Sequence, residues 1–195
     1  GRTVLLKILR PGRHSHVEFA RLKREASLVE QFELTRMMQP LATFESEGMQ
    51  VLVMEDFGQC TLQEFAKQFP LDLPGFLVTA RSIALAISQL HQKGITHTRL
   101  YPGNILYNSE DREVKVSDLE TASLLSDEAA GFINLYQVEK EIAYLAPEQS
   151  GRMNRRVDSR SNLYSLGCIF YEMLTGKPVF SAQNIVELVY AHMAK

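Results

Sequence analysis

The sequence predicts an α+β fold in which a small strand-rich part is followed by a larger, mainly helical part. Two observations support this prediction. The N-terminal region holds an apolar strand pattern and a hairpin pattern, with an amphipathic helix pattern between them. The remainder holds long stretches with apolar residues at helical spacing and only short strand patterns. The chain has 195 residues, 45% of them hydrophobic and 23% charged, so it is long and apolar enough to bury a sizeable core.

The N-terminal elements are predicted in the order strand, helix, hairpin. Residues 3–9 (TVLLKIL) form a β-rich apolar run. Residues 17–32 place apolar side chains at helical spacing, with charged side chains between them. Residues 41–44 and 50–54 flank a turn signal at residues 46–48, which predicts a hairpin.

The strongest helix signal lies at residues 76–92, and Gly94 is expected to end that helix. Its predicted apolar face consists of Leu77, Ala80, Ile83, Ala84, Ile87 and Leu90. The other expected elements are helices at 62–68, 163–174 and 184–194, short strands at 105–107 and 114–116, and a polar, mostly loop stretch at 119–141.

Composition argues against several classes of function. A net charge of −2 and a pI near 6.2 give no electrostatic reason to expect binding to nucleic acid or to an anionic membrane. The basic stretch at 152–160 is interrupted by neutral and acidic residues, which favours a solvated loop or helix start. Cys60 and Cys168 offer neither a disulfide framework nor a metal-ligand spacing, and they fit a reducing compartment.

We find no apolar run of the roughly 18 residues that a membrane span needs, and no signal peptide. We therefore expect a cytoplasmic location and no direct membrane span. The chain starts without a methionine on a strand pattern and ends inside a helical pattern, so we expect a segment of a longer protein.

A set of short motifs follows these elements in a fixed order. Lys7 lies in the first strand pattern, and Glu25 lies in the helix after it. The segment MEDFG, residues 54–58, follows the hairpin. His97 and Asn104 lie in the loop ITHTRLYPGN of the helical part. Each motif is weak alone, because a lysine in a strand or an asparagine in a loop is common.

Two more motifs complete the order. Asp118 follows the second short strand, and Ala146-Pro147-Glu148 precedes the helix at 163–174. Together the motifs resemble the protein kinase family, in which V-A-I-K, H-R-D-x-x-x-x-N, D-F-G and A-P-E follow one another. The resemblance implies the two-lobed protein-kinase fold, truncated at both ends, with the Gly-rich loop belonging before Gly1.

The resemblance extends over nearly the whole chain and implies its division. Residues 1–195 are expected to form a partial kinase-like domain. Residues 1–54 would belong to the N-lobe, 55–58 to the hinge and 59–195 to the C-lobe.

The resemblance also implies the roles of single residues. Lys7 would hold the α- and β-phosphates of ATP, with Glu25 as its orienting partner. Asn104 and Asp118 would hold Mg²⁺. The implied ATP-binding residues are Lys7, Glu25, Met54, Glu55, Phe57, Asn104 and Asp118.

One longer motif narrows the resemblance. Residues 143–155 (AYLAPEQSGRMNR) are similar to the A-Y-I-S-P-E-Q-T-G-R-M-N-R segment of a bacterial group. In that group a serine/threonine-kinase-like domain heads a long signalling protein that also carries an ATPase module, a GAF domain and a histidine kinase. The similarity implies partners among the signalling domains of the same polypeptide, or other proteins.

The chain departs from the family pattern around the phosphoryl-transfer site. Arg99 occupies the position of the catalytic aspartate, and Tyr101 that of the lysine that contacts the γ-phosphate. Glu120 replaces the glycine of D-F-G, and Glu141 the threonine that normally bonds the aspartate. Asn162 replaces the aspartate that braces the catalytic loop. A guanidinium has no acceptor and stays protonated, so it cannot serve as the base.

These departures predict a pseudokinase that regulates or binds other domains, with ATP and Mg²⁺ binding weak or lost. The alternative is an active serine/threonine kinase that transfers the ATP γ-phosphate to protein hydroxyls through an atypical site. Two places for the Arg99 side chain stay open: an added contact to a phosphate, or an ion pair with Glu120 or Glu141.

Regulation is also expected to differ from that of the family. Thr98 replaces the basic residue that usually receives an activation-loop phosphate. Thr121, Ser123, Ser126 and Tyr136 are candidate phosphorylation sites, although solvated loop polarity explains them as well.

Overall fold

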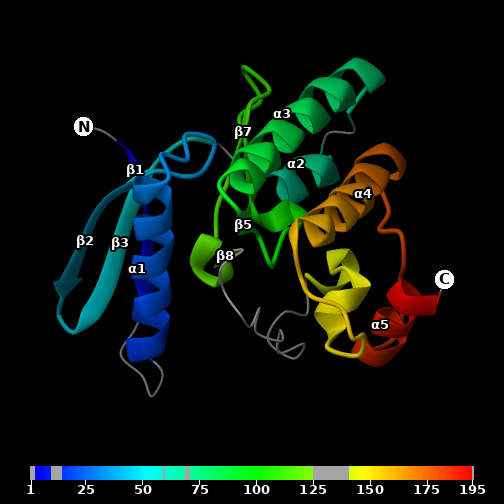
Figure 1. Ribbon diagram of the computed structural model, residues 1–195. Helices are drawn as coiled ribbons and strands as arrows, with labels where there is room; N and C mark the ends of the chain where they lie inside the picture. The colour runs from blue at the N-terminus through cyan, green and yellow to red at the C-terminus, as the bar shows by residue number, and fades with distance from the viewer. Residues whose placement is uncertain (1–2, 10–14, 59, 69–70, 125–140, 195) are drawn as a thin grey trace.

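The computed structural model describes residues 3–9, 15–58, 60–68, 71–124 and 141–194. The predicted α+β architecture is confirmed, with the strand-rich part and the helical part side by side (Figure 1). In chain order, with 3-10 helices marked η, the elements are β1 (Val4–Leu9), α1 (Ser15–Gln31), β2 (Pro40–Ser46), β3 (Met49–Glu55), β4 (Cys60–Thr61), α2 (Leu62–Gln68), α3 (Leu73–Gln92), β5 (Ile95–Thr96), η1 (Pro102–Asn104), β6 (Ile105–Tyr107), β7 (Val114–Val116), η2 (Leu119–Thr121), β8 (Ser123–Leu124), η4 (Ile142–Tyr144), η5 (Pro147–Ser150), α4 (Ser159–Thr175) and α5 (Ile185–Ala194).

The N-terminal sheet is antiparallel, with β3 between β1 and β2. The predicted hairpin turn consists of Glu47 and Gly48, whose φ angles are 51° and 72°. Positive φ at both positions is the mark of a type I′ turn, one of the two turn types whose twist matches that of the flanking strands. The sheet register places Lys7 opposite Leu52, which fixes the position of the lysine relative to β3.

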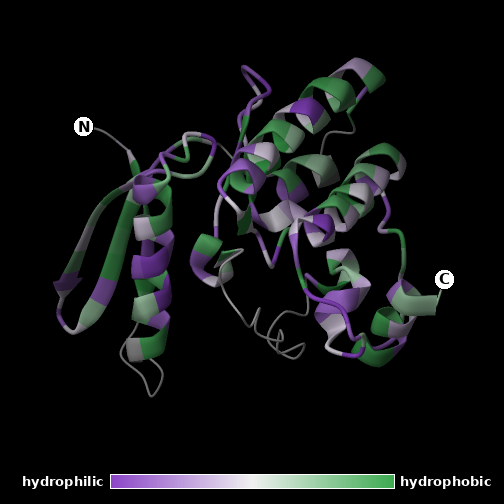
Figure 2. Ribbon diagram, in the orientation of Figure 1, coloured by the Kyte–Doolittle hydropathy of each residue, from purple (hydrophilic) through white to green (hydrophobic). Residues whose placement is uncertain are grey.

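Helix α1 lies beside this sheet, with its axis roughly along the strands (Figure 1). Its bands of hydrophobic and hydrophilic residues, seen in Figure 2, fit an amphipathic helix. Leu22 and Ala26 are buried with Met38, Leu52 and Met54. Glu25 lies on the same buried face of the helix. The packing of α1 against the sheet therefore also positions the Glu25 carboxylate next to the sheet.

The helical part is built around α3 and α4. Asp72 caps α3 by accepting a hydrogen bond from the N–H of Gly75 at 2.9 Å, and Gly94, with φ 67°, follows its end. Ile83 and Ile87 of α3 belong to the same buried cluster as Ile169 of α4. This core supports the short strands that carry the site.

The predicted start and apolar face of α3 are partly wrong. The helix begins at Leu73, because Asp72 supplies an N-cap that the hydrophobic pattern does not reveal. Leu77 is 57% exposed and Ala84 is exposed, while Phe76 and Ala86 are buried in their place. The helix is apolar on more than one face, so periodicity could not choose between them.

Helix α3 also corrects the expectation about apolar length. By length and composition it is long and apolar enough to cross a membrane. Ile83, Ile87 and Leu90 of this helix are buried in the core.

The two short strands predicted at 105–107 and 114–116 are confirmed and pair as β6 and β7. Asn104 directly precedes β6, and Asp118 follows β7 by two residues. The N–H of Ser117 donates to the carbonyl of Asn104 at 2.9 Å, so this small hairpin brings the two chain segments together. In the stretch at 119–141, η2 and β8 are short elements; Ser126 and Tyr136 lie outside the described residues.

Candidate functional site

Three charged groups from distant parts of the chain meet between β1, α1 and η2. The Nζ of Lys7 lies 2.8 Å from Oε2 of Glu25 and 2.6 Å from Oδ1 of Asp118. The other oxygen of Glu25, Oε1, accepts a hydrogen bond from the backbone N–H of Asp118 at 2.8 Å. We call these residues the lysine cluster. The structure therefore brings together three residues that separate sequence motifs predict.

Electrostatics stabilise the charged form of the lysine. Burial works to lower the pKa of Lys7, but the carboxylates of Glu25 and Asp118 outweigh it, and the pKa is raised above its ordinary value. The side chain of Glu25 is 1% exposed, so removing its cation would leave a buried carboxylate without an opposite charge.

Asp118 adopts an unusual backbone conformation. Its φ of 64° and ψ of 43° lie in the left-handed region, which a non-glycine residue seldom occupies. The hydrogen bond from its N–H to Glu25 and the ion pair with Lys7 hold it there. Asp118 is also the first residue of the turn that starts η2.

The segment at 54–58 runs from the sheet toward the helical part. Met54 is fully buried under α1. Glu55 is the last residue of β3, accepts from the N–H of Gln39 at 2.9 Å and pairs with Lys115 of β7. The Nζ of Lys115 also lies 5.0 Å from the centroid of the Phe57 ring. Lys115 was not predicted, because nothing in the sequence marks a contact across this distance.

Gly58 lies against the backbone of β6. A Cβ at this position would approach the carbonyl oxygen of Tyr107 to 3.1 Å, and a strand backbone cannot easily move away. The side chains at this linker and the close backbone approach both tie it to the β6–β7 hairpin.

His97 is buried and packs locally. Its Nδ1 accepts the N–H of Arg99 at 3.2 Å, and its Nε2 lies 2.9 Å from the carbonyl of Ser117. These contacts fit a neutral ring with the proton on Nε2. Burial lowers the pKa of His97, in keeping with the neutral form. Among the described residues, no group of three or more His, Cys, Asp or Glu side chains could hold a metal ion.

Asn162 braces this loop from α4. Its Oδ1 accepts the backbone N–H of His97 at 3.0 Å, while its Nδ2 donates to the carbonyl of the same residue. His91 approaches the same Oδ1 at 3.1 Å through its Nε2. A carboxylate could not donate the second of these bonds, so the amide makes a contact that an aspartate would lack.

Asn104 is buried, and its side chain is engaged with its own loop. Its Nδ2 donates to the carbonyl of Arg99, and its Oδ1 accepts the N–H of Tyr101 at 3.2 Å. The two predicted metal ligands are thus placed on neighbouring segments. However, Asn104 uses its amide to close the loop, and Asp118 uses Oδ1 for Lys7.

Arg99 lies between two carboxylates. Its guanidinium contacts Glu120 at 3.3 Å through one terminal nitrogen and Glu141 through the other. We call these three residues the arginine cluster. The sequence left open whether Arg99 contacts a phosphate or forms an ion pair with Glu120 or Glu141. In the structure, Arg99 forms ion pairs with both glutamates. The Nε of Arg99 is buried and has no hydrogen-bond partner among the described residues.

The titration properties of this cluster follow from burial and charge. Burial works to lower the pKa of Arg99, but its hydrogen bond and ion pair with Glu141 raise it above the ordinary value. Burial, followed by the charge of Asp118, raises the pKa of Glu120. Glu141 itself is 6% exposed, so the guanidinium neutralises a carboxylate that water barely reaches.

Tyr101 lies beside this cluster. Burial, and then the charges of Glu141 and Asp118, raise the pKa of its hydroxyl, so it stays neutral. Its ring covers Gly103, where a Cβ would collide with the ring atoms. This contact explains a glycine that the sequence patterns do not single out.

Thr98 and Gln149 tie the loop to its surroundings. The Thr98 hydroxyl donates to the carbonyl of Thr121 at 2.8 Å and lies 3.0 Å from the Thr121 hydroxyl. Gln149 donates to the carbonyl of Thr98 at 2.6 Å. Thr98 thus makes a neutral contact with η2, at the position where the family carries a basic residue.

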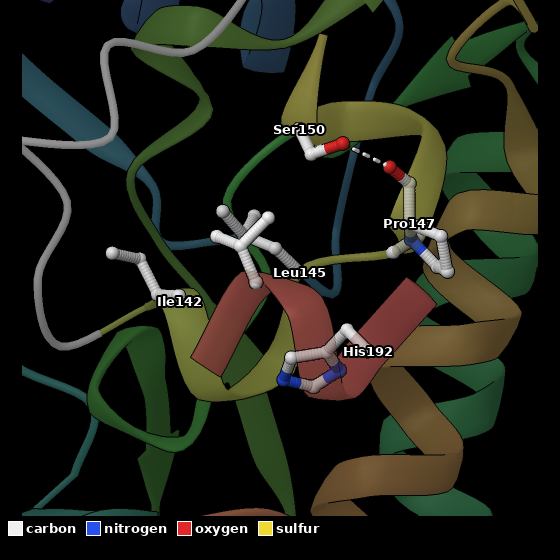
Figure 3. Close-up of a pocket in the computed structure, with 7 residues that line it drawn as sticks. Ile142, Leu145, Pro147, Ser150 and His192 are labelled. Carbon is white, nitrogen blue, oxygen red and sulfur yellow. Dashed lines mark hydrogen bonds between the residues drawn. The ribbon is translucent and has the colours of Figure 1, made fainter. Parts of the chain in front are cut away.

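A separate small pocket lies between η4, η5 and α5 (Figure 3). Its walls are mainly apolar, and they include Ile142, Leu145 and Pro147. His192 forms part of the wall, and its Nε2 is buried with no hydrogen-bond partner among the residues described. None of the predicted ATP-binding residues lines this pocket.

Comparison with known proteins agrees with the fold and the order of motifs. The chain matches the protein kinase domain over residues 1–195. It is 34% identical over 206 residues to the probable serine/threonine-protein kinase PknB of Bifidobacterium longum, covering 100% of this chain and 29% of that protein. It is 30% identical over 198 residues to the serine/threonine-protein kinase PknB of Mycobacterium tuberculosis, covering 98% of this chain and 31% of that protein.

A third relative is the probable serine/threonine-protein kinase SCO3848 of Streptomyces coelicolor, 31% identical over 199 residues, covering 99% of this chain and 29% of that protein. The chain spans 29% to 31% of the length of these curated relatives. The family match over its full length, together with the fold and the motif order, places this chain in the protein kinase superfamily, among relatives named as bacterial serine/threonine kinases.

Proposed function

We propose that this chain is a pseudokinase module that regulates or binds other proteins in bacterial signal transduction. The observation that carries the proposal is the arginine cluster. At the position where the family places its catalytic base, a guanidinium is held between Glu120 and Glu141. A guanidinium cannot accept the proton of a substrate hydroxyl.

The rest of the transfer site supports the same proposal. Tyr101, neutral and folded over Gly103, stands where the family has a lysine that contacts the γ-phosphate. General-base catalysis alone contributes typically 10²–10⁴-fold, and electrostatic stabilisation of the transferred group adds to it. Losing both would lower the rate of phosphoryl transfer by several orders of magnitude.

ATP and Mg²⁺ are proposed to bind weakly or not at all. Lys7 fits the phosphate position, since Glu25 holds its ammonium as kinases do, and Asp118 lies at the metal position, where its Oδ1 pairs with Lys7. The second metal position fits poorly, because the Asn104 amide is bonded to its own loop. Glu120 adds another carboxylate near Asp118. When bound, Mg²⁺ would neutralise phosphate charge; the residues here supply only part of its ligand set.

The proposed partners are signalling domains of the same polypeptide or separate proteins, in the cytoplasm. Two facts support this proposal: the similarity of residues 143–155 to a group of long signalling proteins, and relatives that are much longer than this chain. Helix α3 meets the length and composition test for a span, but its buried residues lie in the kinase core.

A phosphotransfer assay tests the proposal directly. The full-length protein should transfer no radiolabel from ATP above the level of its Lys7→Ala variant. Restoration should use Arg99→Asp and Tyr101→Lys together with Glu120→Gly and Glu141→Thr, because a lone aspartate at position 99 would face two carboxylates. A gain of activity in this variant would show that only the transfer groups were missing. Activity of the unaltered protein that Lys7→Ala abolishes would contradict the proposal.

The second candidate is a serine/threonine kinase with an atypical base. It is favoured by the lysine cluster, which stays assembled, and by relatives named as serine/threonine kinases. Isothermal titration calorimetry of the full-length protein with Mg-ATP distinguishes weak or absent nucleotide binding from the binding that an active kinase needs. Micromolar affinity would contradict weak binding, and transfer that survives Arg99→Ala would point to a base elsewhere.

A further inference from the structure

A hollow with an excess of arginine lies on the surface beside the A-P-E motif. Its lining comes from η5, the loop after it and the start of α4, and consists of Pro147, Glu148, Arg155, Arg156, Asp158, Arg160 and Tyr164. None of these residues belongs to the lysine cluster or the arginine cluster. The hollow is therefore a feature that the proposed loss of catalysis does not explain.

The two carboxylates of the hollow are already engaged. Glu148 accepts a hydrogen bond from the hydroxyl of Ser161 at 2.5 Å. Asp158 caps α4 by accepting the N–H of Arg160 at 2.9 Å, and its second oxygen pairs with the Arg160 guanidinium at 2.6 Å. The Arg160 side-chain contacts lower the pKa of Asp158, so this carboxylate stays charged and occupied by its own neighbour.

Two guanidinium groups remain. In the ranges that the structure describes, Arg155 and Arg156 form no hydrogen bond or ion pair through their side chains. Both are exposed and both line the hollow. With Asp158 paired to Arg160, the single carboxylate of Glu148 faces two adjacent arginines, so the hollow keeps a local positive charge in a chain whose net charge is −2.

We propose that this hollow binds the phosphate of a phosphorylated serine or threonine in a partner protein. A guanidinium presents parallel N–H donors that match phosphate oxygens, and a phosphate dianion can satisfy two such groups at once. Pro147 and Tyr164 add less polar wall against which a peptide can lie. The hollow shape and the small number of free cations favour one phosphate on a peptide over the broad charge of a membrane surface.

This inference goes beyond the proposed function, because it names the chemistry of a partner and shares no residue with the transfer site. The kinase assay and a binding assay therefore test the two separately. A protein that transfers phosphate could still bind through the hollow, and a pseudokinase could lack this binding.

Fluorescence anisotropy of the full-length protein with a labelled peptide Gly-Ala-pSer-Ala-Gly tests the site. The phosphopeptide should bind at least about tenfold more tightly than its unphosphorylated twin. The double variant Arg155→Gln, Arg156→Gln should lose about tenfold or more of this affinity. Arg152→Gln is the matched control, an exposed arginine of the same loop that does not line the hollow.

Three outcomes would overturn the proposal. The first is equal binding of both peptides, and the second is a loss in Arg152→Gln as large as in the double variant. The third is binding to phosphatidylglycerol vesicles that exceeds phosphopeptide binding and depends on the same two arginines, which would assign the hollow to lipid. Circular dichroism melting of each variant confirms that the compared proteins are folded.

Discussion

The lysine cluster and the arginine cluster have the same composition of charges but differ in their relation to the family pattern. In each, one cation meets two carboxylates. The lysine cluster joins β1 and α1 of the strand-rich part to η2 of the helical part. The arginine cluster lies wholly within the helical part. The first contains the lysine–glutamate pair that the family uses at the phosphates of ATP, whereas the second is an ion-pair network at the position where the family has its catalytic aspartate.

The short helix η2 connects the two clusters. Asp118 starts it and pairs with Lys7, while Glu120 lies within it and pairs with Arg99. Between them, Leu119 is fully buried and anchors the turn in the core. The comparison teaches that the two clusters are linked through two positions of one turn, so residue types alone would not show how closely the clusters are coupled.

Removing the cation of the lysine cluster should have the largest effect. We expect Lys7→Met to lower the free energy of unfolding by about 3–5 kcal/mol, because Glu25 would be left buried without an opposite charge. Urea denaturation followed by circular dichroism measures it. The control is Lys177→Met, at an exposed lysine, with an expected change within about 0.5 kcal/mol. Equal effects of the two substitutions would contradict the importance of the cluster.

Breaking the arginine cluster should cost less, because the carboxylates that it would leave, Glu120 and Glu141, are more exposed than Glu25. We expect Arg99→Gln to lower the free energy of unfolding by about 2–3 kcal/mol, since Glu141 stays buried. Adding Glu141→Gln should recover part of this loss, and the double-mutant cycle should give a coupling of about 1–2 kcal/mol. Strictly additive single effects would show that the pair does not stabilise the fold.

Asn162→Asp restores the residue that the family pattern leads one to expect, yet it should destabilise this chain. The carboxylate would face the carbonyl of His97 without a proton to donate, at a cost of about 1–3 kcal/mol. Thermal unfolding compared with Asn154→Asp, at an exposed asparagine, isolates this effect. A more stable Asn162→Asp protein would mean that the amide is not the better fit.

The smallest expected effect concerns His97, whose backbone and ring contacts link the loop of Arg99 to the segment of Asp118. Its folded pKa is lowered from 6.5, so the stability it contributes is present above pH 6.5 and is lost as the pH falls through that value toward the folded pKa. We expect His97→Gln to show a flatter decline in stability below pH 6.5. An NMR titration that places the His97 pKa at or above 6.5 would contradict this.

Much of the fold could be predicted because local patterns decide it. Helix α2 and the strands β6 and β7 lie at the predicted residues, and the Glu47-Gly48 turn follows from its own backbone needs. The face of α3 could not be predicted, because the helix carries apolar side chains on several sides and its neighbours choose among them.

The candidate site also has a part that could be predicted from the sequence and a part that could not. Motif order located Lys7, Glu25 and Asp118, and the structure brings them into contact. Their roles in ATP binding remain predictions. The contacts of Arg99 were left open by the sequence, because Glu141 is 42 residues away and only the fold places it. The pairing of Lys115 with Glu55 leaves no local trace in the sequence for the same reason.

Because Arg99 pairs with two glutamates, single substitutions at any of these three positions should destabilise the protein. An aspartate introduced at position 99 alone would place a new carboxylate beside Glu120 and Glu141, and it would remove the cation that both contact. Changing either glutamate first leaves the arginine short of a partner. A series of single changes from this site to one with the family's catalytic residues would therefore pass through less stable intermediates, unless several positions change together.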